Sequence, residues 1–368
     1  MRYLTNQKVG GEQTPLSAHG EASPPMAASA ETCSQLTRSV KGRFMTFRGF
    51  NPTDSRLGKA YYLKINRLRG RETSYGFSDR RGHFDERSSS TLLRSLIEAG
   101  KPLMVARYGS TELGCVLDYL QRQSISNWIA FLTGTRRWVG QRASTPRDME
   151  VLSGFFPASA DSLRKFARQI LADSALVDVL GTWMLEEKFV AHLHPAANLV
   201  PLRLLEPFWS EVPWTSALAG KRVLVIHPFA ETIEAQYRQR EKLFSDSRIL
   251  PSFDLVTIKA VQTIAGERSH FKDWFDAFDS MAMRVARVDF DVALIGCGAY
   301  GFSLAAQVKR LGKQAVHLGG ATQLLFGIVG NRWLERPEYR QLMNDFWTRP
   351  TEGERPSGFM AVENWCYW

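Results

Sequence analysis

Three closely spaced glycines give the clearest chemical signal in the chain. Gly296, Gly298 and Gly301 follow the apolar run 292–295, which is typical of a strand buried on both faces of a parallel sheet. Glycines at this spacing let the backbone turn sharply and approach a ligand closely. They also leave the free N–H groups of the next helix directed at an anion. The stretch therefore predicts a phosphate-binding turn.

The same glycines spell the Gly-x-Gly-x-x-Gly pattern of dinucleotide-binding folds, so a nicotinamide- or flavin-dependent oxidoreductase is one alternative. Such a site needs an acidic residue about twenty positions further on, at the end of the next strand, to bind the ribose hydroxyls. That strand, predicted over 314–318, is followed by Gly319 and Gly320 without a carboxylate. We therefore expect no NAD. The glycines could also serve only the tight turns between strands and helices.

A second candidate site follows the predicted strand 103–106. Arg107 would lie at its carboxyl end, and Glu112 in the first turn of a helix that continues to Leu120. Open α/β sheets place ligand-binding groups at this edge. A guanidinium can bind pyrophosphate through two contacts, and a carboxylate can hold a metal or a sugar hydroxyl. The two side chains could equally be a capping pair at a helix start.

Alternating strands and helices must position these groups. Strands are predicted over 223–226, 253–261, 292–295 and 314–318, and helices over 92–99 (capped by Ser90), 161–172, 176–189, 231–244 and 274–288. Between them, His192 and His194 suit one face of a strand, with no third zinc ligand nearby. Strands that alternate with helices of this length predict right-handed crossovers and a Rossmann-like, mainly parallel α/β sheet.

The expected domain organisation has two parts. Residues 1–88 are predicted to be a disordered or loosely ordered basic extension, because they contain few large apolar groups. Residues 89–368 would form the α/β domain, with a helical aromatic insert at about 155–211, a Rossmann-like half at about 221–330 and an aromatic C-terminal tail at 331–368. The tail could pack on the body as a strap or line an acceptor or sugar pocket.

Charge and cysteine content argue against nucleic-acid-binding, zinc-binding and disulfide-rich classes of protein. The net charge is +10, but residues 36–90 alone carry thirteen Lys and Arg against five Asp and Glu, so the folded body is not a nucleic-acid surface. The basic arm is either solvated or suited to an anionic membrane surface or other polyanion. Four widely spaced cysteines indicate neither a zinc cage nor a disulfide framework, and no apolar run is long enough for a membrane span. We expect a cytoplasmic protein, peripheral to the inner face of the membrane if the arm binds it.

Over residues 92–368 the chain resembles the GT-D-fold glycosyltransferases and GT-D-like proteins of bacterial polysaccharide gene clusters. The resemblance is carried by RYGSTE (107–112), FDVALIGCGAYG (290–301), HLGGATQLLFGI (317–328) and the closing WTRP (347–350) and CYW (366–368). It implies transfer of a sugar from a nucleoside diphosphate donor, with UDP favoured, to a glycan or lipid-linked acceptor. The residues that would bind the nucleotide sugar are Arg107, Gly109, Ser110, Gly296, Gly298, Tyr300, Gly319, Gly320 and Gln323.

In better-known members of that family the first motif resembles Arg-Phe-Gly-Asp-Gly-Glu, whose two acids are associated with the donor and its divalent metal. Glu112 matches the Glu, but Ser110 stands in place of the Asp. Arg107 and Glu112 are then the expected catalytic pair, with Glu112 as the single candidate ligand for Mn²⁺ or Mg²⁺ unless the substrate's phosphates supply more. A nucleotide-binding scaffold without catalytic activity is the remaining alternative.

Overall fold

The computed structural model describes residues 85–121, 129, 145–267, 269–362 and 366–368. The chain divides into the units Met1–Met45 and Thr46–Trp368, and every described residue belongs to the second. The predictions for residues 1–84 of the basic extension lie outside the described residues.

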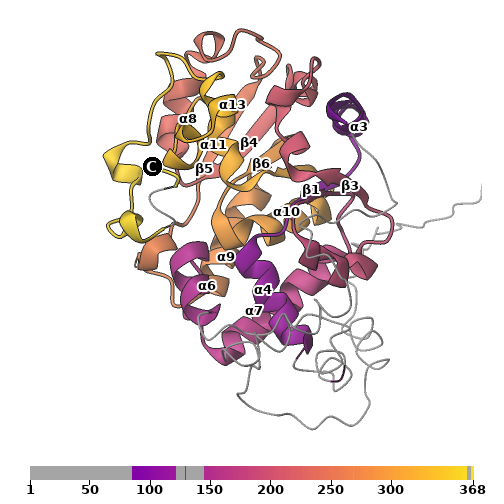
Figure 1. Cartoon of the computed structure of the whole chain (residues 1–368), viewed down its shortest axis with the longest axis vertical. Coiled ribbons are helices and arrows are strands. Elements are labelled where there is room, and N and C mark those ends of the chain that lie inside the picture. The colour runs from indigo at the N-terminus through magenta and orange to yellow at the C-terminus, as the bar shows by residue number, and fades with distance from the viewer. Residues whose placement is uncertain (1–84, 122–128, 130–144, 268, 363–365) are drawn as a thin grey trace, which may run out of the picture. The chain divides into compact units, whose positions relative to one another are not determined.

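The centre of the described unit is a seven-stranded, all-parallel sheet with the order β3-β2-β1-β7-β6-β4-β5 (Figure 1). The strands are β1 (Leu103–Ala106), β2 (Val179–Thr182), β3 (Asn198–Pro201), β4 (Arg222–His227), β5 (Asp254–Lys259), β6 (Val292–Ile295) and β7 (Gln314–His317). The predicted parallel, Rossmann-like α/β fold is confirmed.

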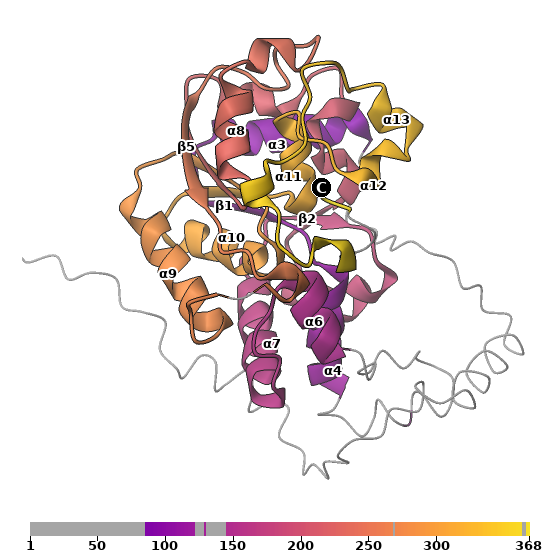
Figure 2. The same ribbon diagram turned by 90° about the vertical axis from the view of Figure 1, so that its left-hand side faces the viewer.

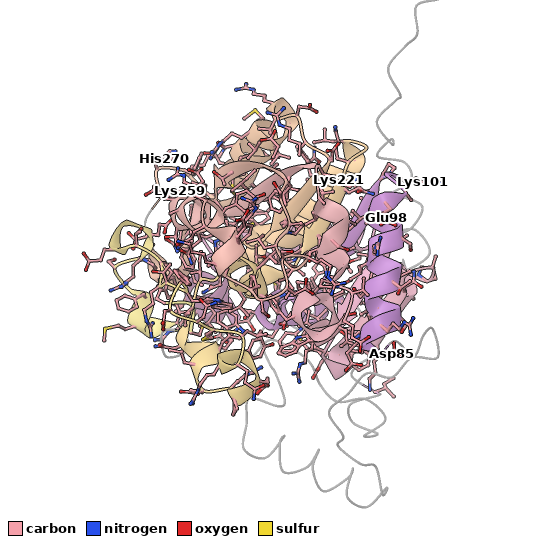
Figure 3. The ribbon with its side chains drawn as sticks, turned by 90° about the horizontal axis from the view of Figure 1, so that it is seen from above. Asp85, Glu98, Lys101, Lys221, Lys259 and His270 are labelled. Carbon is pink, nitrogen blue, oxygen red and sulfur yellow. The ribbon has the colours of Figure 1, made fainter. Side chains whose placement is uncertain are left out.

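Alternate residues of the central strands supply two apolar cores, one on each face of the sheet. Met104 and Ala106 point into the first core, whereas Leu103 and Val105 point into the second. The first core is covered by α4 (Ser110–Gln121), α6 (Thr145–Ser153), α7 (Ala160–Ser174), α9 (Trp274–Arg287) and α10 (Gly301–Arg310), of which α4, α6 and α7 lie side by side (Figure 2). The second is covered by α3 (Glu86–Glu98), α8 (Ala230–Tyr237), α11 (Thr322–Leu325) and the C-terminal segment. Figure 3 labels Glu98 at the end of α3 and Asp85, which caps its start.

The strand order creates a crevice at the carboxyl edge of the sheet. From β4 the chain crosses through α8 to β5, and from β6 it crosses through α10 on the opposite face to β7. Because β4 and β6 are neighbours, their following loops diverge, which is the point at which open α/β sheets bind ligands. The short helices α12 (Asn331–Leu334) and α13 (Pro337–Arg340) follow α11.

Several expected elements were wrong. The first helix begins at Glu86 with Asp85 as its cap, so the boundary at 88 falls inside α3 and Ser90 is buried within it. Residues 176–189 form β2 and a short 3₁₀ turn, because the apolar run of a strand buried on both faces also fits a helical pattern. Residues 155–211 are therefore not a helical insert: they supply two strands of the sheet. His192 lies on a 3₁₀ turn, not a strand, and α8 ends at Tyr237.

Candidate functional site

A cavity of about 330 Å³ opens at the carboxyl edge of the sheet. It is lined by the segments that follow β1, β4, β6 and β7, together with α12, α13 and the C-terminal residues. Its volume is at the lower end of the range for small-molecule sites, about 300–1,000 Å³. The cavity thus coincides with the crevice at the switch point of the strand order.

All the candidate residues line this one cavity. They come from three stretches far apart in the sequence: Arg107, Gly109, Ser110, Glu112, Gly296, Gly298, Tyr300, Gly319, Gly320 and Gln323. Because β1, β7 and β6 are adjacent in the sheet, their carboxyl ends bring these stretches together. The sequence indicated two separate candidate sites, and the neighbouring positions of β1, β7 and β6 join them in one.

Arg107 is the cation nearest the glycine turn after β7. Its Nη1 donates a hydrogen bond to the Tyr108 carbonyl at 3.0 Å. The guanidinium lies against Gly319, where a Cβ would be 2.5 Å from Nη2 and 2.8 Å from Nε. Nε itself is buried and has no hydrogen-bond acceptor among the described residues. A buried donor without an acceptor is costly, so this guanidinium is suited to bind an anion in the cavity.

Glu112 and Ser110 lie in the first turn of α4. The Glu112 carboxylate folds back over its own helix start, since a Cβ on Gly109 would clash with it. The carboxylate therefore lies beside the N-terminal turn of its own helix. Ser110 is exposed at the same turn.

The donor atoms at this turn do not fit a divalent metal. Mg²⁺ and Mn²⁺ prefer several oxygen ligands, and here one carboxylate is accompanied by one hydroxyl. Across the described ranges, no three His, Cys, Asp or Glu side chains are grouped so that they could hold a metal ion.

The glycine turn after β6 is packed against protein atoms. Gly298 has a left-handed backbone, with φ of +56°. A Cβ on Gly296 would be 2.6 Å from the Gly319 carbonyl oxygen and 2.7 Å from His227 Cδ2. A Cβ on Gly301 would overlap the imidazole of His317, lying 2.6 Å from its Cδ2. Two of the three glycines are therefore needed for close packing of histidines, in addition to the turn itself.

Tyr300 and Gln323 shape the wall through contacts within the fold. The Tyr300 ring is buried and stacks on Trp274, with ring centroids 5.0 Å apart. The Gln323 side chain is fully buried, and its Nε2 donates to the Tyr367 carbonyl at 3.1 Å, whereas Oε1 has no partner within the part of the chain described. Tyr300 thus holds the glycine turn, and Gln323 holds the C-terminal residues.

Two buried histidines flank the glycine turn, and sequence reasoning assigned a role to neither. His227 ends β4 and His317 ends β7, on either side of β6. Burial lowers the pKa of each imidazole to about 3, so both are neutral at pH 7. The Nδ1 atom of His227 accepts the backbone N–H of Phe229 at 3.0 Å. The signal that could have found them is their position as the last residue of a buried strand.

A second wall comes from the segment after β2. The Trp183 side chain is 46% exposed, and its Nε1 donates to the Tyr108 carbonyl at 3.0 Å. Its backbone N–H donates to the Glu187 carboxyl group at 3.2 Å. Glu187 is fully buried, and burial raises its pKa to about 8, although the positive charge of Arg107 opposes this. This wall was missed because residues 176–189 were interpreted as a helix.

The C-terminal residues form the opposite wall. Trp368 is 3% exposed and packs against Phe229, so the tail is a buried strap. Tyr367 also lines the cavity, and its ring lies against Gly320, where a Cβ would be 2.5 Å from Cε1. The Arg332 guanidinium lies 5.0 Å from the centre of the Tyr367 ring. The end of the tail thus packs on the body and also lines the cavity, and an acceptor or sugar pocket at this place stays a prediction.

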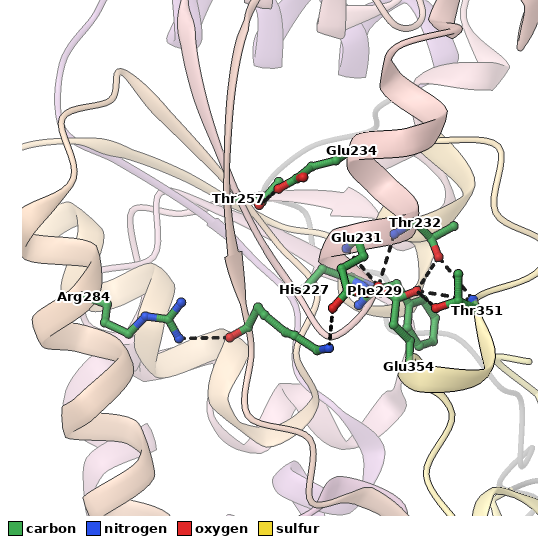
Figure 4. Close-up of polar contacts among 10 residues, drawn as sticks. His227, Phe229, Glu231, Thr232, Glu234, Thr257, Arg284, Thr351 and Glu354 are labelled. Atoms are coloured by element: carbon green, nitrogen blue, oxygen red, sulfur yellow. Dashed lines mark hydrogen bonds and ion pairs between the residues drawn. The ribbon is translucent and has the colours of Figure 1, made fainter.

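The N-terminus of α8, beside His227, is already occupied by a carboxylate of the chain. Glu354 is 1% exposed and accepts the backbone N–H groups of Glu231 at 2.9 Å and Thr232 at 3.2 Å (Figure 4). Its other oxygen accepts the Thr232 hydroxyl and the Thr351 backbone N–H. This helix end is therefore closed to an anionic ligand, and the turns after β1, β6 and β7 remain.

The cavity has a positive balance of charge. Arg107, Arg332 and Arg336 line it, against the carboxyl groups of Glu112 and Glu206. Glu206 is half-buried, and loss of solvent raises its pKa; its carboxyl group already accepts hydrogen bonds from a tyrosine hydroxyl and a tryptophan N–H. No described helix is long and apolar enough to cross a membrane.

Comparisons with models of protein families, with curated proteins and with solved structures found no match to this chain.

Proposed function

We propose that the protein is a glycosyltransferase that transfers a sugar from a nucleoside diphosphate donor, with UDP favoured, to a glycan or lipid-linked acceptor in bacterial polysaccharide assembly. One observation carries the proposal: the buried, unsatisfied Nε of Arg107 lies in a cationic cavity where the turns after β1, β6 and β7 meet. The sequence resemblance to GT-D-fold enzymes supports the same reading, and so does the position of the cavity in the sheet.

In this proposal Arg107 binds the diphosphate. Its guanidinium and the backbone N–H groups near Gly109 stabilise the negative charge that develops on the leaving group as the bond to the sugar breaks. The remaining arginines of the cavity, Arg332 and Arg336, add to the positive potential that attracts the donor.

Glu112 is the proposed base. Its carboxylate accepts the proton of the acceptor hydroxyl while the hydroxyl oxygen forms its bond to the anomeric carbon and the diphosphate departs with the bonding electrons. The carboxylate lies in the first turn of α4 and lines the cavity, where an acceptor hydroxyl would have to approach the donor. The exposed face of Trp183 and the ring of Tyr367 provide flat apolar surfaces of the kind that pack against sugar rings.

Calorimetric titration of the purified protein with UDP, CDP, GDP, UDP-sugars and NAD, each with and without Mn²⁺, tests donor binding. In Arg107→Gln the dissociation constant of the preferred nucleotide should rise about 10- to 100-fold, the usual effect of losing a hydrogen bond to a charged group. Arg238→Gln is the matched control, because Arg238 is exposed and does not line the cavity.

Measuring donor turnover separates the proposed binding role of Arg107 from the proposed catalytic role of Glu112. Glu112→Gln should keep nucleotide binding and lose most transfer or donor hydrolysis, and unchanged turnover would contradict the assignment of Glu112. Binding of NAD alone would favour the oxidoreductase alternative. Tight binding of a nucleotide without turnover of any sugar donor would favour a scaffold.

A further inference from the structure

His227 faces the glycine turn from the strand next to it. In the order β7-β6-β4, Ile295 at the end of β6 pairs with Ile226 on one side, and His227 is the next residue of β4. The edge of the imidazole lies against Gly296, where a Cβ would be 2.7 Å from Cδ2. His227 is 3% exposed and lines the cavity. The ring is therefore held between its own loop and the turn predicted to bind phosphate.

Its hydrogen bond defines the tautomer. Nδ1 accepts the backbone N–H of Phe229 at 3.0 Å (Figure 4), and a neutral imidazole that accepts at Nδ1 carries its proton on Nε2. Burial alone accounts for the lowering of the pKa of His227 to about 3, so the ring is neutral at pH 7. Among the described residues the hydrogen bond of this imidazole is the one that Nδ1 accepts, and His227 lines the cavity, which leaves Nε2 for a ligand. The chain thus presents a neutral N–H donor at the cavity wall.

We propose that His227 is a ligand-binding residue whose Nε2–H donates a hydrogen bond to a phosphate oxygen of the nucleotide in the cavity. This inference rests on the proposed function, because it names a contact for the same donor. The positive charge that neutralises the phosphates comes from Arg107 and the other arginines of the cavity. His227 contributes a directional hydrogen bond that orients the phosphate group. A neutral imidazole with Nδ1 already occupied by Phe229 neither takes up nor releases a proton in this role.

Long-range ¹H–¹⁵N correlation spectra of ¹⁵N-histidine-labelled protein at pH 7 test the tautomer directly. The chain has seven histidines, so the spectrum of His227→Asn assigns His227 by difference. We expect the Nε2–H tautomer in the free protein and a downfield shift of this proton when UDP is added. An Nδ1–H tautomer or a charged ring would overturn the inference.

Two substitutions test the contact. The shorter amide of His227→Asn can still accept from Phe229 but has no donor at the Nε2 position, whereas His227→Gln places an amide N–H close to it. The dissociation constant of UDP should rise about tenfold in His227→Asn, equivalent to about 1.4 kcal/mol, with partial recovery in His227→Gln. His192→Asn, an exposed histidine outside the cavity, should change nothing.

The outcomes distinguish this inference from the function on which it rests. If wild type and His227→Asn bind UDP equally, the inference fails and the proposed function stands. If wild type binds pyrophosphate with the expected shift of the His227 signal but no nucleotide, the donor assignment fails and the phosphate contact is supported. If neither UDP nor pyrophosphate binds, both are overturned.

Discussion

Removing the Glu354 carboxylate should destabilise the protein through the N-terminus of α8. In Glu354→Ala two backbone N–H groups of the first helical turn lose their acceptor in a buried place. Loss of a helix cap costs about 0.5–2 kcal/mol, and each buried donor left unsatisfied costs about 1–3 kcal/mol. Because water can reach part of the space that the side chain leaves, we expect a total loss of about 3 kcal/mol.

Glu354→Gln separates charge from shape. The amide keeps one oxygen acceptor but loses the negative charge that faces the positive end of the helix, and its NH₂ group meets the hydroxyl and N–H donors of Thr232 and Thr351. The expected loss is about 1–2 kcal/mol. Glu352→Gln is the matched control: it lies exposed on the same short turn and should change stability by less than about 0.5 kcal/mol.

Urea denaturation followed by circular dichroism measures these differences, provided that unfolding is reversible and the m-values agree. Thermal unfolding should show Glu354→Ala about 5–10 °C below wild type. A loss below about 0.5 kcal/mol in Glu354→Ala would refute the view that this buried carboxylate holds the helix start and the strap together.

Four further substitutions test the contacts described above. Gly301→Ala should lower the free energy of unfolding by about 2 kcal/mol or more in calorimetry, because the new methyl group overlaps a buried imidazole. Gly114→Ala, in the middle of α4 where no atom lies near the added methyl group, should raise it by about 0.5–1 kcal/mol. The Glu187 carboxyl group, with a pKa of about 8 in the folded protein against 4.5 unfolded, retains its proton in the fold between these values, so its contribution to stability falls as pH rises through that window. The free energy of unfolding of Glu187→Gln should therefore rise relative to that of wild type between pH 5 and 8, by up to about 1.4 kcal/mol per pH unit. Urea denaturation at several pH values measures this difference. Arg310→Met should lower the free energy of unfolding by about 1–3 kcal/mol in the same assay, because the buried Asp173 carboxyl group loses its ion-pair partner, although the Arg310 side chain is itself 43% exposed.

The position of the site could be predicted because it depends on strand ends. Short apolar runs followed by glycine located β1, β6 and β7, and a parallel sheet places Arg107, Gly296 and Gly319 at the same edge. That they meet in one cavity depends on the strand order β1-β7-β6, which the local pattern does not predict. His227 and His317 could also have been predicted to lie at the site, because each is a hydrogen-bonding side chain at the carboxyl end of a strand.

The walls of the cavity could not be predicted in this way. The segment before Trp183 has apolar residues that suit a helix or a buried strand, and only pairing with β1 and β3 decides between them. Arg332, Tyr367 and Glu354 take their places through contacts between the tail and segments far away in the sequence. Local pattern contains no information about such contacts.

The fit between the glycines that follow β6 and the histidines that end β4 and β7 has a consequence for how this chain can vary. Gly301 leaves room for the ring of His317, and Gly296 leaves room for the ring of His227. The two residues of each pair therefore share a fixed space, so a larger residue at the turn can be accommodated only if the residue at the strand end is smaller. Related chains that lose one member of a pair should lose the other, so paired variation at these positions would trace the site even where the glycine spacing has disappeared.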